Sequence, residues 1–262
     1  MFAHGVRLTI AYDGTDFCGW QKQRAERSVQ KVLEDTIAGI TGHPIKLRAA
    51  SRTDSGVHAL GNVAAFCTSR FIDTTGWRQG INSELPEDVS VTHVSACSPD
   101  YNPRHDTLGK RYRYLLEIAR VRHPLYRKYV WHPHVAAQSF DVERLRHGAK
   151  IFEGTHDFAA FRNSADTRVS TVRHISEIKV DPGFSNEPSL IAVEVHGTAF
   201  MHHMVRIMVG TLLKVAIGRM SLDQLRELLG PLGTRGRAGM TAPASGLCLK
   251  EVLLGRQIEG AS

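Results

Sequence analysis

Residues 51–59 read Ser-Arg-Thr-Asp-Ser-Gly-Val-His-Ala, a polar loop between two apolar runs that are typical of β-strands. Asp54 stands among small residues, and Gly56 permits the positive φ of a tight turn. Such a loop can hold a carboxylate at the rim of a cleft without a bulky neighbour. Alternatively, Asp54 only caps its own turn with its side chain. The residues of the loop leave both interpretations open.

The residues before and after this loop predict a mixture of strands and helices. Val6–Tyr12 alternates apolar and polar residues, which is typical of a half-buried strand. Apolar residues at steps of three and four predict a helix over 29–40, with Ser28 as its N-cap and Gly42 just past its end. Further strands are predicted at 45–50, 62–68 and 89–96, and a short helix at 74–83.

The pattern starts again after Pro103. It predicts strands at 110–118, 171–181, 189–196 and 247–254, and helices at 142–152, at 203–217 and from Ser221 to about 230. Because each half mixes strands and helices, we expect an α+β fold of two similar lobes. The polar stretch Ser98–Thr107 places their boundary, so the expected domains are residues 1–103, with the Asp54 loop, and 104–262.

Composition and charge favour a globular protein with a polyanionic partner. The chain has 262 residues, of which 42% are hydrophobic and 23% charged, and this excludes wholesale disorder. Its 33 basic and 26 acidic residues give a formal net charge of +7. Eight basic and two acidic residues lie between Arg104 and Lys128, so most of the excess positive charge is in this run. This distribution strengthens the expectation of a polyanionic partner.

Several common chemistries have no motif in this sequence. No P-loop, dinucleotide fingerprint, nucleophile elbow or zincin motif occurs, and the glycine-rich basic segment Gly233–Gly239 fits none of them. The four cysteines have no metal-binding spacing. His202 and His203 are adjacent, so we expect them to point to different faces. The motifs therefore exclude these common mechanisms, and packing or hydrogen bonding is the default interpretation of the histidines.

The sequence also predicts that the chain stays out of membranes. No secretory signal pattern opens the chain, and the most apolar stretch, Met201–Ile217, is short and contains Arg206 and Lys214. We therefore expect a cytoplasmic protein.

Five segments together resemble one family. SRTDSGVHA (51–59) resembles the catalytic motif G-R-T-D-x-G-V-H-A of the tRNA pseudouridine synthase A family. The segments YDGTDFCGWQ (12–21), KRYRY (110–114), FMHHMVR (200–206) and GLCL (246–249) are similar to its other motifs and occur in the family's order. Ser51 is the visible departure, because glycine is usual there, and it bears on loop geometry rather than chemistry.

The resemblance implies a function and a fold. The family isomerises uridine to pseudouridine at positions 38, 39 and 40 of the tRNA anticodon stem-loop, without cofactor or metal. It works as a homodimer in which tRNA touches both subunits. Its two α+β lobes share an extended, mainly antiparallel central sheet flanked by helices, with the active cleft between the lobes.

The resemblance also implies roles for particular residues. Asp54 acts on the nucleotide, by attacking C1′, adding to the base or removing the 2′ proton, and Arg206 pairs with its carboxylate. Tyr112 packs on the target uracil, Leu249 forms an apolar wall for the base, and Arg52 helps to flip the nucleotide or to hold the adjacent backbone. Apart from the resemblance, Arg206 could be a helix arginine facing water, Tyr112 a half-buried strand tyrosine and Leu249 an ordinary core residue.

Basic residues around Tyr112 are predicted to contact tRNA phosphates. These are Lys110, Arg111 and Arg113, with Arg24 from the N-terminal half, and Arg111 and Arg113 are expected on the face opposite Tyr112. Alternatively, they are solvated charges at a strand edge.

Two other functions remain open at this point. One is a catalytically silent RNA-binding protein of the same fold, which would not require Asp54, Tyr112 and Arg206 together. The other is a hydrolase with a histidine-bound metal.

Overall fold

The computed structural model describes residues 4–23, 26–166, 169–230 and 232–255, and the chain divides into two compact units. Unit 1 comprises Met1–Leu108 and Leu249–Ser262, and unit 2 comprises Gly109–Cys248. The expected domains, 1–103 and 104–262, differ from this division in two ways. The boundary lies a few residues later, after Leu108, and β9 belongs mostly to unit 1. Periodicity in the sequence gives no signal for such a long-range return of the chain.

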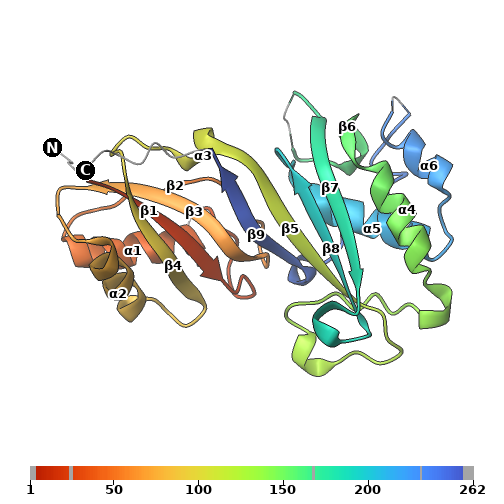
Figure 1. Cartoon of the computed structure of the whole chain (residues 1–262), viewed down its shortest axis with the longest axis horizontal. Helices are drawn as coiled ribbons and strands as arrows, with labels where there is room; N and C mark the ends of the chain where they lie inside the picture. The colour runs from red at the N-terminus through yellow and green to blue at the C-terminus, as the bar shows by residue number, and fades with distance from the viewer. Residues whose placement is uncertain (1–3, 24–25, 167–168, 231, 256–262) are drawn as a thin grey trace. The chain divides into compact units, whose positions relative to one another are not determined.

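Unit 1 is built on an antiparallel sheet in the order β4-β1-β3-β9, with β2 pairing β3 (Figure 1). Its strands are β1 (His4–Tyr12), β2 (Arg48–Ala49), β3 (His58–Thr68), β4 (Val89–Cys97) and β9 (Leu247–Leu254), and its helices α1 (Val29–Thr41), α2 (Thr74–Glu84) and α3 (Pro103–Asp106). In the register, Leu8 lies opposite both Ala64 and Val94, and all three side chains are buried.

Helix α1 shows why these residues form this unit. The Ser28 side chain accepts a hydrogen bond from the Lys31 amide, and Gly42 ends the helix with φ 76°, so both predicted caps are confirmed. Leu33 and Ile37 lie on its buried face and have no exposed surface. Burying side chains of this size stabilises the unit by about 1.5–3 kcal/mol each.

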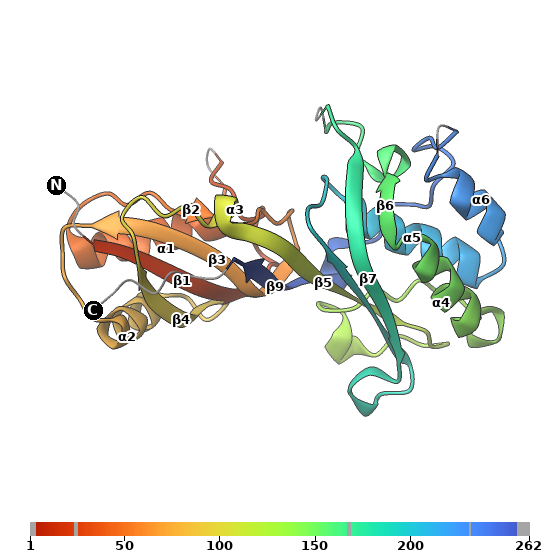
Figure 2. The same cartoon turned by 45° about the horizontal axis from the view of Figure 1, so that its top comes forward.

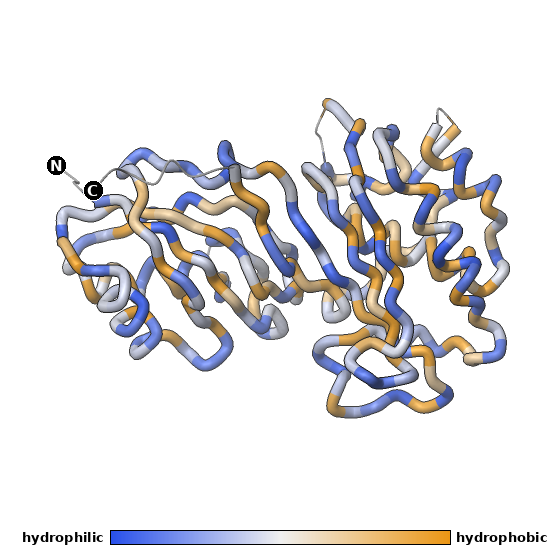
Figure 3. The backbone as a smooth tube through the Cα atoms, in the orientation of Figure 1, coloured by the Kyte–Doolittle hydropathy of each residue, from blue (hydrophilic) through white to orange (hydrophobic). Residues whose placement is uncertain are grey.

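Unit 2 has a second antiparallel sheet in the order β5-β8-β7-β6, with three helices beside it (Figure 2). Its elements are β5 (Thr107–Glu117), α4 (Val142–Ile151), β6 (Gly154–Asp157), β7 (Val172–Pro182), β8 (Leu190–Gly197), α5 (Met204–Ala216) and α6 (Leu222–Glu227). The rings of Phe152, Phe158 and Phe161 pack together with centroids 5.0–6.2 Å apart. Hydrophobic and hydrophilic residues alternate along the strands (Figure 3).

Each unit combines helices with antiparallel strand pairs, so the predicted α+β class and the mainly antiparallel pairing are confirmed. The strand predicted at 45–50 is only Arg48–Ala49, because only these two residues find partners on β3. The helix after Ser221 ends at Glu227, earlier than predicted. Within the described ranges, no helix has both the length and the apolar character needed to cross a bilayer.

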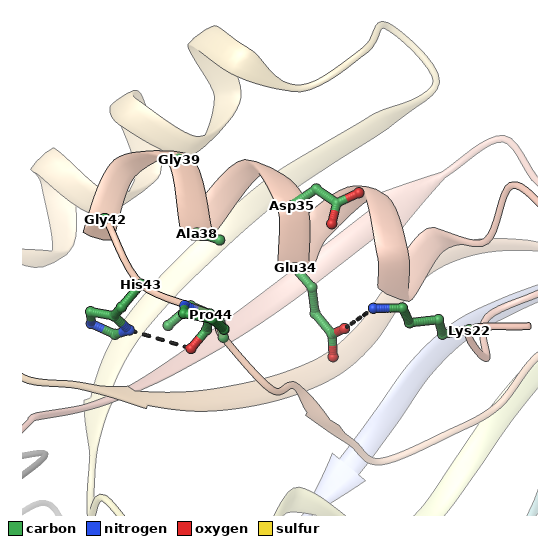
Figure 4. Close-up of a pocket in the computed structure, with 9 residues that line it drawn as sticks. Lys22, Glu34, Asp35, Ala38, Gly39, Gly42, His43 and Pro44 are labelled. Carbon is green, nitrogen blue, oxygen red and sulfur yellow. Dashed lines mark hydrogen bonds and ion pairs between the residues drawn. The ribbon is translucent and has the colours of Figure 1, made fainter. Parts of the chain in front are cut away.

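A buried carboxylate joins α1 to the chain that follows it. Glu34 has only 8% of its surface exposed, and its Oε1 accepts hydrogen bonds from the Leu47 amide at 3.0 Å and the Gln30 side chain at 2.9 Å. Its Oε2 lies 3.7 Å from Nζ of Lys22, whereas neighbouring Asp35 points away to solvent (Figure 4). Glu34 therefore holds the segment leading to β2 against α1.

Glu34→Ala is expected to lower the free energy of unfolding by about 1–3 kcal/mol, because it leaves the buried Leu47 amide without an acceptor. The matched control is Asp35→Ala on the same helix, which loses only an exposed ion pair with Lys31 and should change stability by less than about 0.5 kcal/mol. Urea unfolding followed by circular dichroism measures both. Equal losses in the two variants would contradict the role given to Glu34.

Candidate active site

The Asp54 loop is a tight turn between β2 and β3. The Val57 amide donates to the Asp54 carbonyl at 3.1 Å, and Gly56 has φ 76°, which confirms the predicted positive φ. Asp54 is half-buried. Ser51 is buried and is not among the residues with positive φ. This position therefore does not require glycine, the residue that is usual in the family motif.

The opening segment after β1 supports this loop by direct backbone contact. The Trp20 amide donates to the Thr53 carbonyl at 3.0 Å. A Cβ atom on Gly19 would lie 2.7 Å from the same oxygen, and one on Gly14 would lie 2.1 Å from the Val57 carbonyl oxygen. These approaches exclude any side chain at either position. The segments 12–21 and 51–59, which carry two of the sequence motifs, therefore pack directly against each other.

A buried polar network supports the loop from the sheet. The hydroxyls of Tyr12 and Thr53 lie 2.7 Å apart. The Asn62 amide group donates to the Ser51 carbonyl at 3.2 Å and to the Tyr12 hydroxyl at 3.4 Å. Asn62 has no exposed surface, and sequence reasoning missed it as a functional residue. The signal was a polar amide within an apolar strand, because a buried amide needs hydrogen-bond partners.

His58, the histidine of the same motif, ties the start of β3 to the opening segment. Its Nδ1 accepts a hydrogen bond from the Gly14 amide at 3.0 Å and lies 3.1 Å from Oδ1 of Asp13. Only 6% of its surface is exposed. The Asp54 turn is thus held at both of its ends.

Arg52 and Leu249 occupy different environments within unit 1. Arg52 is exposed and makes no hydrogen bond or ion pair with any residue that the structure describes, so its guanidinium is available to a ligand. Leu249 on β9 has no exposed surface. Their predicted roles toward the nucleotide stay predictions.

Arg206 lies in the first turn of α5, in unit 2. Its Nε donates to the Ala242 carbonyl at 2.7 Å, and the Ala242 amide donates back to the Arg206 carbonyl at 3.2 Å. The residue is half-buried, so it is neither a fully solvated helix arginine nor a core residue. Its predicted pairing with Asp54 stays a prediction.

The glycine-rich segment 233–239 begins a segment, residues 233–243, that lies against α5 and that we name the strap. A Cβ atom on Gly210 would lie 2.0 Å from the Met240 carbonyl oxygen, and one on Gly239 would lie 2.3 Å from Gly210. The Gly239 amide also donates to the buried Thr211 hydroxyl at 2.8 Å. The glycines of residues 233–239 therefore have a structural role. They allow the strap to lie against α5, where the Ala242 carbonyl contacts Arg206.

Two tyrosines on β5 point into unit 2. Tyr112 has 7% of its surface exposed, and its ring meets that of Phe200 edge-on at 5.1 Å. Tyr114 is fully buried, its hydroxyl donates to the Pro243 carbonyl at 2.8 Å, and burial raises its pKa. Gly246 leaves room for that ring, because a Cβ atom there would lie 2.5 Å from it.

The basic residues of β5 are less available than the sequence suggested. Lys110, Arg111 and Arg113 are all half-buried. Nε of Arg113 lies 2.9 Å from Oε1 of Glu194 on the neighbouring strand, and its guanidinium lies over the Phe184 ring. Their predicted contacts with tRNA stay predictions, and Arg24 lies outside the described residues.

The expectation for the paired histidines was wrong. The rings of His202 and His203 do not point to different faces but lie with centroids 3.9 Å apart. His203 has φ 62°, a left-handed conformation that is uncommon for residues other than glycine. Asn163 contacts Nδ1 of His203 at 2.7 Å, and the His202 amide donates to Asp166.

Comparison with known proteins identifies the family. The sequence profile of the tRNA pseudouridine synthase family matches residues 8–106 and 149–253, which include the Asp54 loop, α5 and the strap. The chain belongs to this family. Tyr112 lies outside the matched ranges, so its role rests on the KRYRY segment alone.

Individual relatives in the tRNA pseudouridine synthase family are similar over almost their whole length. The tRNA pseudouridine synthase A of Acetivibrio thermocellus is 39% identical over 94% of this chain and 98% of its own. That of Geotalea uraniireducens is 40% identical over the same shares, and that of Syntrophotalea carbinolica is 38% identical over 97% and 99%. A chain of a Cbf5–Nop10–Gar1 complex is 12% identical with a TM-score of 0.35, covering 80% of this chain and 54% of that one, which is too low to bear on fold or function.

Asn62→Ala is expected to lower both stability and turnover. It removes the buried donor to the Ser51 carbonyl and the Tyr12 hydroxyl, at a cost of about 1–3 kcal/mol, and loosens the loop that carries Asp54. The control is Asn82→Ala, which removes hydrogen bonds between α2 and β4 away from the loop. Urea unfolding and single-turnover pseudouridine formation measure the two effects. If Asn62→Ala lost no more turnover than Asn82→Ala, Asn62 would be a stabilising residue only.

Gly239→Ala is expected to lower the free energy of unfolding by about 1–3 kcal/mol, because the added methyl group meets the α5 backbone. Displacing the strap also removes the Ala242 carbonyl from Arg206, so the rate of pseudouridine formation should fall. The matched control is Gly236→Ala in the same segment, where a Cβ atom meets nothing within 4 Å. Thermal melts that gave the same midpoint for both variants would show that the strap does not need this glycine.

Proposed function

We propose that this chain isomerises uridine to pseudouridine in tRNA, at positions 38, 39 and 40 of the anticodon stem-loop, and that Asp54 acts directly on the target nucleotide. Family membership supports the reaction class. The observation that carries the assignment is the support of the Asp54 turn by the opening segment and by the Tyr12–Thr53–Asn62 network. A carboxylate held in this way needs little reorganisation when the substrate arrives.

The reaction breaks the bond between C1′ and N1 and forms a bond between C1′ and C5, with the C5 proton lost and one gained at N1. A uridine in a stem must first leave its stack, which costs a few kcal/mol. Arg52 is exposed two residues before Asp54, so it can meet the displaced backbone or hold the space left behind. Its positive charge suits a phosphate there.

The remaining residues position the base and the carboxylate in this proposal. Nε of Arg206 donates to the Ala242 carbonyl, which orients its guanidinium, a group that binds a carboxylate or phosphate through two nitrogens. Tyr112 offers a flat ring for the uracil, tilted by its contact with Phe200. Leu249 provides an apolar wall. We also propose that the protein acts in the cytoplasm and that it works as a homodimer.

Asp54→Asn is the decisive substitution. The amide keeps the size of the side chain but can serve neither as a nucleophile nor as a base, so turnover should fall by about 10²–10⁴-fold or more. Folding and tRNA affinity should stay near those of the wild type. Asp223→Asn, on exposed α6, is the control for loss of one negative charge.

The measurement is pseudouridine mapping of anticodon stem-loops after treatment with each purified variant. Conversion by Asp54→Asn at a rate near that of the wild type would overturn the assignment of Asp54. Binding of tRNA by the wild type without any pseudouridine would instead favour a catalytically silent RNA-binding protein.

A further inference from the structure

The basic run continues past β5 into a closed loop of residues 119–130, which we name the excursion. Its ends are fastened to each other: the Glu117 amide donates to the Trp131 carbonyl at 2.9 Å, and the Trp131 amide donates to the Leu115 carbonyl at 3.0 Å. The chain therefore leaves β5 and returns to it, as the yellow-green segment below β5 shows in Figure 1.

The excursion is ordered internally by a buried acid and by a ring stack. Glu117, with 3% of its surface exposed, accepts a hydrogen bond from the His123 amide at 2.8 Å. The rings of His123 and Tyr126 stack with centroids 4.5 Å apart. The amides of Tyr129 and Val130 both donate to the Tyr126 carbonyl. This shape exists without a partner, so binding costs little ordering entropy.

The excursion is rich in positive charge. It carries Arg120, Arg122, Arg127 and Lys128 and no acidic residue. Arg120 and Arg122 are exposed and make no ion pair or hydrogen bond with any described part of the chain. Three other exposed cations of unit 2 do have carboxylate partners three residues away, in the pairs Arg144–Asp141, Arg226–Asp223 and Lys150–Glu153. Unpaired arginines on a fixed loop suit a polyanion.

Large apolar side chains stand exposed between these cations. Val121 is 77% exposed, Leu125 73% and Tyr129 47%. Single exposed apolar residues are ordinary, but three on one short ordered loop indicate a surface that a partner covers. A partner with both phosphates and flat apolar faces satisfies both features, and unpaired RNA offers both.

We propose that the excursion is an RNA-binding surface, with Arg120 and Arg122 on phosphates and Leu125 and Tyr129 against unstacked bases of the tRNA substrate. The proposal rests on the proposed function for the identity of the RNA. It assigns the RNA contacts of the basic run to the excursion rather than to β5, where Arg113 is already paired with Glu194.

The test compares the double variant Arg120→Gln/Arg122→Gln with the wild type for binding of tRNA, measured by fluorescence anisotropy between about 50 and 200 mM salt. Loss of two phosphate contacts should reduce the slope of log affinity against log salt by about 1.4–1.8, and affinity should fall about tenfold. The matched control is Arg144→Gln/Arg226→Gln, with the same change in charge and an unchanged slope expected. A second variant, Leu125→Ser, should weaken binding without changing the slope.

Three outcomes would overturn this inference. They are an unchanged affinity and slope in the Arg120/Arg122 variant, an equal change in the control, and a change in oligomeric state by sedimentation with tRNA affinity intact, which would assign the surface to a second copy of the chain. Pseudouridine formation is measured on the same preparations. An inactive wild type would overturn the proposed function, whereas an active wild type with an unaffected Arg120/Arg122 variant overturns only the excursion.

Discussion

One close approach between two backbones determines where Asp54 lies. The opening segment passes so near the turn that Gly14 and Gly19 have no room for a Cβ atom. The turn, which joins β2 to β3, is therefore fixed by the segment that follows β1 rather than by its own few residues. Loop entropy would otherwise spread the carboxylate over many positions, at about 1–2 kcal/mol for each residue that must then be ordered. The buried amide of Asn62 adds the same constraint from within the sheet.

Unit 2 applies the same principle to different residues. Arg206 and Tyr114 each contact a carbonyl of the strap, Ala242 and Pro243 respectively. The strap reaches them because Gly210 and Gly239 allow its backbone to lie against α5. In both units, a side chain of interest is held by main-chain atoms from a distant part of the sequence. Such atoms do not change with substitution, although the glycines that admit them are intolerant of any side chain.

Periodicity in the sequence predicted most elements, because long amphipathic runs such as β1 and α1 bury a regular face. It missed β6 and α3, which are too short to repeat a pattern. It also assigned β9 to the wrong half, since a return of the chain leaves no local signal. Of the site, the Asp54 turn was predicted from its glycine. Asn62 carried a signal that was missed, an amide within an apolar strand. The strap and the Glu194 partner of Arg113 depend on contacts across many residues and could not be predicted.

The return of β9 sets an order of events during synthesis. In unit 1, β9 lies beside β3, and the two backbones are close enough that a Cβ atom on Gly61 would be 2.6 Å from the Lys250 carbonyl oxygen. Nine of the eleven residues of β3 are buried. Until residue 254 has left the ribosome, the part of this apolar strand that β2 does not cover presents an open edge, the feature by which nascent sheets aggregate. Unit 1 therefore completes its sheet only after the whole of unit 2 has been synthesised, when β9 pairs with β3.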